Sequence, residues 1–121
     1  MNILVVEDEI HVASVLADAL GAQGHRVTLA HDAEEASALL ARHRPDAVVL
    51  DVILGELSGV ALLRKIRKVD PTLPVVLMTG HANETEIAQA RQLGIADVVE
   101  KPFLLNRLTE AIQGIQAARQ P

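Results

Sequence analysis

The hydrophobic residues of this chain fall into two alternating patterns. Short continuous apolar runs, rich in β-branched residues, are typical of strands buried on both faces of a parallel sheet. Between them, apolar residues recur every three or four positions, as they do on one face of a helix. The short runs are Ile3–Val6, Ala47–Leu50, Val75–Met78 and Val98–Val99, with a weaker run at Val27–Ala30.

Five stretches carry the helical pattern, and most have start and stop signals. Asp32 and Glu35 have the spacing of a capping box. Asn83 and Glu86 have the same spacing, and Ser58 can cap the third helix. Stop signals stand at Gly21 and Gly24, Arg44-Pro45, Asp70-Pro71 and Gly94. The apolar faces are Val12, Val15, Leu16, Ala19 and Leu20; Ala36, Leu39 and Leu40; Leu62, Leu63 and Ile66; Ile87, Ala90 and Leu93; and Leu105, Leu108, Ile112 and Ile115.

A strand followed by a helix, repeated five times, predicts an α/β fold. Alternation of this kind gives a parallel sheet with helices on both faces and right-handed crossovers. The 121 residues are within the usual size of one domain, so we expect a single domain over residues 1–121. Residues 117–121 are expected to be a frayed tail or the stump of a linker.

Composition narrows the function classes. The formal net charge is −5 and the only aromatic residue is one Phe, so we expect no direct nucleic-acid binding, which needs basic clusters and stacking platforms. The chain has no cysteine, which excludes thiolate metal sites and fits a reducing cytoplasm. The N-terminus does not resemble a signal peptide, and no apolar stretch is long enough to span a membrane.

Polar residues follow the predicted strands at one edge of the sheet. Glu7–Glu9 come after the first strand, Asp51 after the third, Thr79 after the fourth and Lys101 after the fifth. Ligand sites in doubly wound sheets lie at the carboxyl ends of the strands. Taken singly, each residue could be a solvated turn or a helix cap. Their joint placement indicates a site.

The residue types favour phosphoryl chemistry assisted by a metal ion. Clustered carboxylates repel one another and attract a cation, and oxygen ligands without Cys or a His cluster select a hard ion such as Mg²⁺. Asp51 could then attack phosphorus as a nucleophile. Lys101 could pair with one phosphoryl oxygen, and Thr79 could donate a hydrogen bond to another.

At this point the chain resembles the receiver domain of bacterial two-component response regulators. The motifs are ILVVEDE at 3–9, PDAVVLDVIL at 45–54, PVVLMTGHA at 74–82 and EKPF at 100–103. The resemblance covers essentially the whole chain. It implies a flavodoxin-like fold, in which a five-stranded sheet of order 2-1-3-4-5 has two helices on one face and three on the other.

The resemblance also assigns roles around a Mg²⁺ ion. It implies that Asp51 is the phospho-acceptor and a metal ligand. Asp8 matches the direct metal ligand of the family's acidic pair, and Glu7 matches the partner that acts mostly through water. The backbone carbonyl of Ile53 matches the third protein ligand.

Further positions match on the other side of the site. Thr79 matches the hydroxyl that moves toward the phosphoryl group, and Lys101 matches the family's lysine. Lys101–Pro102 matches a peptide bond that is usually cis in the family, and Gly59 matches a glycine of the neighbouring loop. The resemblance implies a phosphoprotein that catalyses its own phosphorylation and slow dephosphorylation without being a conventional enzyme.

Two positions depart from the family pattern. Val98 stands where the family usually has Tyr or Phe, so the coupled movement of hydroxyl and aromatic ring must use another element. Leu54-Gly55 replaces the frequent Met-Pro, and we expect the glycine to loosen the loop beside Asp51. Ile53 and His81 lie two residues beyond Asp51 and Thr79. We expect Ile53 to shield the acyl phosphate and His81 to modulate access to it.

The partners are also implied by the resemblance. The phosphoryl donor would be a sensor histidine kinase or a phosphotransfer protein. The face formed by the fourth helix, fifth strand and fifth helix, which includes Ile87, Arg91, Val98 and Arg107, would dimerise or dock an output partner.

Three other readings compete with this one. The main alternative is a pseudo-receiver, an interaction module of the same fold that phosphorylation does not regulate. A phosphatase with an Asp nucleophile would need a second acid two residues after Asp51, where Ile53 stands. A flavin or nucleotide binder would need a glycine-rich loop after the first strand, where Glu7–Glu9 stand.

Overall fold

Strands and helices alternate as the hydrophobic pattern predicts. The computed structural model describes residues 1–80, 83–100 and 105–119. His81, Lys101 and Pro102, which the sequence singled out, lie outside these ranges. The strands are β1 (Asn2–Val6), β2 (Arg26–Ala30), β3 (Ala47–Asp51), β4 (Ile53–Leu54), β5 (Leu57–Ser58), β6 (Val75–Thr79) and β7 (Asp97–Glu100).

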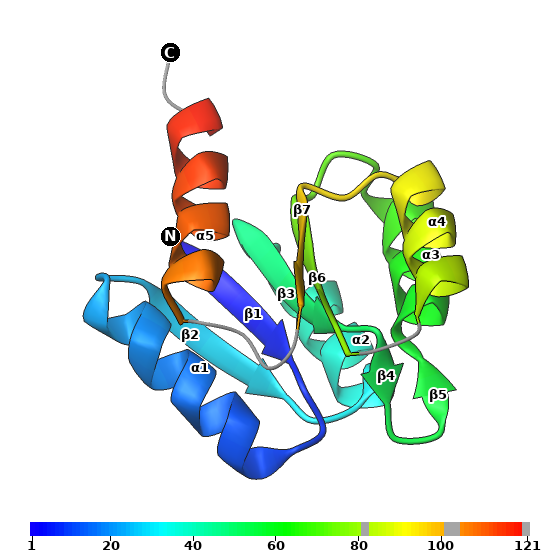
Figure 1. Ribbon diagram of the computed structural model, residues 1–121, viewed down its shortest axis with the longest axis horizontal. Helices are drawn as coiled ribbons and strands as arrows, with labels where there is room; N and C mark the ends of the chain where they lie inside the picture. Colours follow the sequence, from blue (N-terminus) through cyan, green and yellow to red (C-terminus); the bar gives the residue numbers. More distant parts are fainter. Residues whose placement is uncertain (81–82, 101–104, 120–121) are drawn as a thin grey trace.

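Five of these strands form one parallel sheet of order β2-β1-β3-β6-β7 (Figure 1). Since β6 and β7 are its fourth and fifth strands along the chain, the predicted order 2-1-3-4-5 is confirmed. The short strands β4 and β5 pair with each other as an antiparallel hairpin, which the sequence analysis missed.

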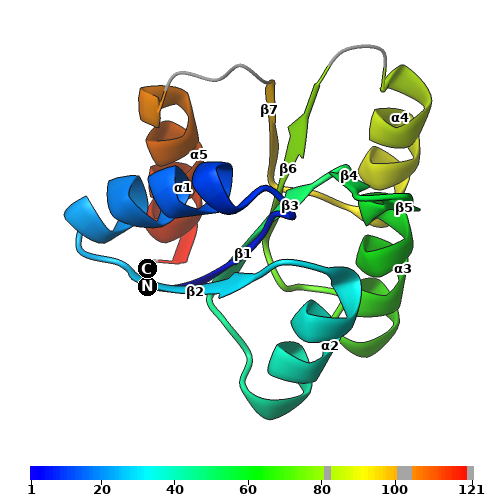
Figure 2. The same ribbon diagram turned by 90° about the horizontal axis from the view of Figure 1, so that it is seen from below.

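The helices cover both faces of the sheet as predicted. They are α1 (Ile10–Ala22), α2 (Ala33–Arg42), α3 (Gly59–Val69), α4 (Glu84–Leu93) and α5 (Leu105–Arg119). Figure 2 shows α1 and α5 on one face and α2, α3 and α4 on the other. Alternate residues of β1 serve the two layers: Leu4 and Val6 pack toward α2–α4, whereas Ile3 and Val5 pack toward α1 and α5.

Most helix boundaries follow the sequence signals, with small differences. The Asp32 side chain accepts a hydrogen bond from the Glu35 N–H at 2.7 Å, and Ser58 accepts one from Val60 at 3.1 Å. α1 continues through Gly21 to Ala22. Val15 was predicted on the packed face of its helix but is 49% exposed, because it lies at the edge of that face.

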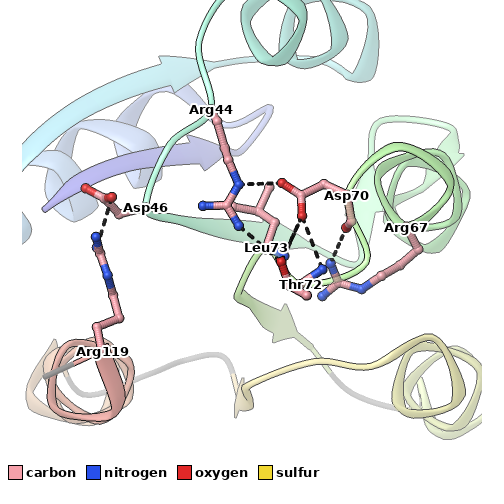
Figure 3. Close-up of polar contacts among 7 residues, drawn as sticks. All are labelled: Arg44, Asp46, Arg67, Asp70, Thr72, Leu73 and Arg119. Carbon is pink, nitrogen blue, oxygen red and sulfur yellow. Dashed lines mark hydrogen bonds and ion pairs between the residues drawn. The ribbon is translucent and has the colours of Figure 1, made fainter. Parts of the chain in front are cut away.

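The Asp70 carboxylate contacts several neighbouring groups (Figure 3). It lies at the end of the sheet opposite the predicted acidic residues Glu7, Asp8 and Asp51. Asp70 is the C-cap residue of α3, and its carboxylate accepts hydrogen bonds from the backbone N–H groups of Thr72 and Leu73 at 3.1 and 3.0 Å. Arg44, from the loop after α2, forms an ion pair with the same carboxylate. The hydrogen bond from Arg44, more than any other contact, holds the pKa of Asp70 below its usual value.

The Arg67 side chain fastens α3 to the C-terminal end of α4. Its guanidinium donates to the carbonyls of Leu93 and Gly94 at 3.1 and 2.7 Å, and to the Asp70 carbonyl at 3.0 Å. These are groups that a helix end leaves without intrahelical partners. Gly94 is in the left-handed region with φ +92°, which ends α4 as the sequence predicts. The C-terminal end of α4 is therefore firmly held.

α5 extends to Arg119, into the segment that was expected to be frayed. Arg119 forms an ion pair at 2.9 Å with Asp46 (Figure 3). The Asp46 carboxylate also accepts a hydrogen bond from the Asn2 N–H at 2.6 Å. The end of α5 is thereby tied to the beginnings of β1 and β3.

Replacing Asp70 with Asn should lower the free energy of unfolding by about 1 kcal/mol near pH 7. Because the fold depresses the pKa of Asp70, the carboxylate stabilises the protein fully above its unfolded pKa of about 3.9. That contribution is lost as the pH falls through the lower folded pKa. The difference between D70N and wild type should narrow by about pH 3 in urea titrations, whereas a constant difference would contradict this account. Asp18→Asn, on the exposed side of α1, is the control.

Candidate functional site

Three carboxylates meet where β1 and β3 end. Glu7 and Asp8 follow β1 directly, and Asp51 is the last residue of the adjacent β3. One carboxylate oxygen from each of the three lies within 4.8 Å of those from the other two. Glu7 is fully buried and Asp51 is 4% exposed, while Asp8 is open to solvent. The predicted acidic cluster is therefore present at the predicted edge of the sheet.

Backbone N–H groups orient each of these carboxylates. The Ile53 N–H donates to Asp51 Oδ1 at 3.0 Å, and the Gly55 N–H donates to Asp8 Oδ2 at 3.0 Å. The Glu9 N–H donates to Glu7 Oε1 at 3.3 Å. Backbone donors favour the charged form of a carboxylate, so they help to keep like charges close together.

The β4–β5 hairpin explains the contact with Asp8. Leu54 pairs with Leu57, which leaves a two-residue turn at Gly55 and Glu56. Gly55 has φ +61°, as the first position of the tight hairpin turns requires. The glycine therefore makes a defined turn that presents its N–H to Asp8.

Gly59 is confined by the backbone of Asp51. A Cβ atom placed on Gly59 would lie 2.0 Å from the Asp51 carbonyl oxygen. The Gly59 N–H donates to the Val52 carbonyl at 2.6 Å, so the first turn of α3 presses against the end of β3. Glycine is needed here because of this close approach, and the contact positions Asp51 relative to α3.

Thr79 lies at the end of β6, next to Asp51. Asp51 is in register with Met78, so Thr79 comes one residue beyond it at the same edge. Its side chain is 1% exposed, and its hydroxyl donates to the Gly80 carbonyl at 3.2 Å. The same oxygen accepts a hydrogen bond from Asn83 Nδ2 at 3.0 Å. Asn83 was expected to cap α4, so its contact with Thr79 was not predicted.

The remaining residues that the sequence predicted for the site are only partly covered by the described ranges. Glu100 ends β7 in register with Thr79, and Lys101 comes next but lies outside the described residues, as do Pro102 and His81. Val98 is half-buried and packs against the apolar layer under α3 and α4. Ile53, by contrast, is 53% exposed beside Asp51.

One histidine lies beside the acidic cluster without having been singled out by the sequence. His31 is half-buried, and its Nδ1 lies 3.3 Å from the carbonyl oxygen of Glu7. Because a carbonyl only accepts, this bond requires the proton on Nδ1. His31 follows β2, which pairs with β1, and that register was the signal that could have placed it near Glu7.

The donor set suits a hard cation. All three candidate side-chain ligands are carboxylates, and one of them is exposed enough for an ion to keep bound water. Mg²⁺ and Ca²⁺ both prefer such oxygen ligands. The cluster can therefore hold a metal ion.

Comparison with known proteins agrees with this fold. Residues 3–113 match the family model of the response regulator receiver domain. The response regulator MprA of Mycobacterium avium (strain 104) is 35% identical over the whole chain, which spans 53% of that relative. The receiver domain of NtrX from Brucella abortus superposes with a TM-score of 0.86 at 38% identity, over 94% of this chain and 98% of that one.

A second solved structure gives the same result. A putative response regulator from Chloroflexus aurantiacus has a TM-score of 0.88 at 29% identity, over 96% of this chain and 97% of that one. The chain belongs to the receiver domain family of two-component response regulators. It spans about half the length of the curated relatives it matches. Among the residues described, no helix combines the length and apolar character needed to cross a bilayer.

Replacing Gly59 with Ala should destabilise the protein by about 3 kcal/mol, because the new methyl group would collide with the Asp51 backbone. Urea unfolding measures the loss. The matched control is Gly114→Ala on α5, where nothing lies within 4 Å of an added Cβ. That variant should gain about 0.5–1 kcal/mol, since alanine is the better helix former. Equal stability of the two variants would contradict the close approach.

Proposed function

We propose that the chain accepts a phosphoryl group on Asp51 in a Mg²⁺-dependent reaction, with a sensor histidine kinase or a phosphotransfer protein as the donor in the cytoplasm. The observation that carries this proposal is the convergence of three carboxylates within 4.8 Å at the end of β1 and β3. Membership of the receiver family supports it further.

Asp51 is suited to act as the nucleophile. Its Oδ1 is held by the Ile53 N–H, and that contact fixes the orientation of the carboxylate. In the transfer, a carboxylate oxygen forms a bond to phosphorus while the phosphorus–nitrogen bond of the donor phosphohistidine breaks. The electron pair of that bond leaves with the imidazole nitrogen. The product is an acyl phosphate on Asp51.

Asp8, Asp51 and Glu7 are the residues that would hold Mg²⁺, together with the backbone carbonyl of Ile53. When bound, the ion neutralises charge on the phosphoryl oxygens. Glu7 is the buried member of the set, and its Oε1 is already oriented by the Glu9 N–H. Asp8 is the exposed member and is presented by the hairpin turn.

Thr79 and Lys101 complete the proposed site. Thr79 stands beside Asp51 on the neighbouring strand, and its hydroxyl would donate to one phosphoryl oxygen. Lys101 directly follows the last residue of β7 and would pair with another. Phosphorylation adds about −1.5 to −2 charge, so both groups would be drawn toward it.

The readiest test uses acetyl phosphate as a small-molecule donor. Wild type should incorporate label only with Mg²⁺, and Asp51→Asn should abolish incorporation because it removes the nucleophile. Asp8→Asn should weaken Mg²⁺ binding by about tenfold or more, because the site loses a charged ligand. Asp18→Asn, on the exposed face of α1, should behave as wild type.

Lack of Mg²⁺-dependent labelling in wild type would instead favour a pseudo-receiver that only binds a partner.

The same labelling assay tests whether Ile53 shields the acyl phosphate. Because its exposed side chain lies beside Asp51, Ile53→Ala should lose label faster than wild type. His81, outside the described residues, is proposed to modulate the same step.

We further infer that the face of α4, β7 and α5 passes the change to a second copy or an output partner. On this face Arg107 of α5 pairs with Asp97 of β7 at 2.7 Å, and that bond lowers the pKa of Asp97. Light scattering with and without beryllium fluoride, a phosphoryl analogue, should show an increase in mass if a second copy binds. Unchanged mass would remove the dimer from the proposal.

A further inference from the structure

Thr79 enters two hydrogen bonds that a movement toward Asp51 would disturb. Its hydroxyl proton is donated to the Gly80 carbonyl, and its oxygen accepts Asn83 Nδ2 at 3.0 Å. Both Thr79 and Asn83 are buried, at 1% and 9% exposure. Breaking a buried hydrogen bond costs free energy, and the cost is larger when one partner is left without a replacement. Thr79 therefore cannot move toward Asp51 without lengthening or breaking its hydrogen bond with Asn83.

Asn83 occupies the N-cap position of α4 without acting as a cap. Asparagine is among the best capping residues, yet within the described residues this side chain accepts no hydrogen bond from the helix. Its backbone also differs from that of the working caps. Its ψ is 33°, whereas Asp32 and Ser58, which do cap their helices, have ψ of 172° and 131°. The contact with Thr79 replaces the cap.

Two arrangements are open to the Asn83 side chain. In one, its amide holds Thr79. In the other, its carbonyl oxygen accepts the N–H of Thr85 or Glu86, the second and third residues of α4, as N-caps do. A helix cap and a buried hydrogen bond between neutral groups contribute similar free energies, so a small bias would decide between the two arrangements.

Val98 stands where the resemblance leads one to expect an aromatic side chain that could follow Thr79. Val98 has no hydroxyl and no ring, and it packs with Ile87 and Leu93 against the apolar layer. It cannot follow Thr79 by forming or breaking a hydrogen bond. Among the residues described, the direct polar link between Thr79 and α4 is Asn83.

We propose that Asn83 is a positioning residue that couples Thr79 to the N-terminus of α4. The inference rests on the proposed function. When Thr79 donates to a phosphoryl oxygen, its proton leaves the Gly80 carbonyl and its oxygen leaves the Asn83 amide. Asn83 then rotates to an extended ψ and caps α4. No covalent bond changes; one pair of hydrogen bonds is exchanged for another.

The exchange can be tested without any phosphoryl group. Thr79→Val removes the acceptor, so Asn83 should turn to α4 and increase protection of the Thr85 or Glu86 N–H from hydrogen exchange, followed by NMR. Thr79→Ser keeps the hydroxyl and should leave that protection unchanged. In the Asn83→Ser background, Thr79→Val should have no such effect. Unchanged protection in Thr79→Val alone would overturn the proposal whatever Asp51 does.

Beryllium fluoride with Mg²⁺ tests the coupling in the proposed active state. In wild type, binding should raise protection of the first turn of α4. Asn83→Ser keeps a cap in both states, and Asn83→Ala has none in either, so binding should leave the first turn unchanged in both. Asn106→Ser, near the exposed start of α5, should respond as wild type.

The proposed phosphorylation of Asp51 and the proposed coupling through Asn83 would be contradicted by different results. Affinity for beryllium fluoride should stay within about fivefold of wild type in the Asn83 variants. The reason is that the free energy of the α4 cap nearly cancels that of the Asn83–Thr79 contact. If the Asn83 variants bind it and the first turn of α4 still responds, the coupling is wrong and the phosphorylation site stands. If wild type does not bind it at all, the proposed function fails, and the Thr79→Val comparison still decides the role of Asn83.

Discussion

The close approach of three carboxylates at one edge of a buried parallel sheet is the constraint on which the site depends. Like charges at this distance repel, and burial of Glu7 and Asp51 makes their charged forms more costly. The fold opposes this cost with backbone N–H groups from the segments that follow β1 and β3. A cluster of carboxylates oriented in this way could hold a cation, which would relieve their mutual repulsion.

The helix layers and the strand order could be predicted from the sequence because the hydrophobic pattern is strong in both the strands and the helices. Runs such as Val75–Met78 have no polar face, and only a sheet covered on both sides can bury them. The acidic cluster was recovered for the same reason: once parallel strands are assigned, the residue after each strand must arrive at one edge. Local pattern therefore determined where Glu7, Asp8 and Asp51 would meet.

The sequence did not predict the contacts that form between separate segments of the chain. The β4–β5 hairpin is too short for a periodic signal, although Gly55 marked its turn. Local spacing assigned Asn83 to a helix cap, but tertiary contact with Thr79 overrode that preference. His31 reached Glu7 only through the pairing of β1 with β2. Positions where a local rule fails in this way are often functional, because the energy forgone locally is used elsewhere.

The two ends of α4 are held by contacts of very different strength. At its C-terminal end the Arg67 guanidinium makes charge-assisted hydrogen bonds to Leu93 and Gly94, while among the described residues the side-chain hydrogen bond near the other end is the neutral one from Asn83 to Thr79. Ten residues make a rigid rod of about 15 Å. A rod pivoted at one end acts as a lever, so a tilt of about 10° would carry its free end by about 2.6 Å over that length. If the proposed coupling through Asn83 holds, a change the size of one hydrogen bond would become a displacement large enough for a neighbouring molecule to detect.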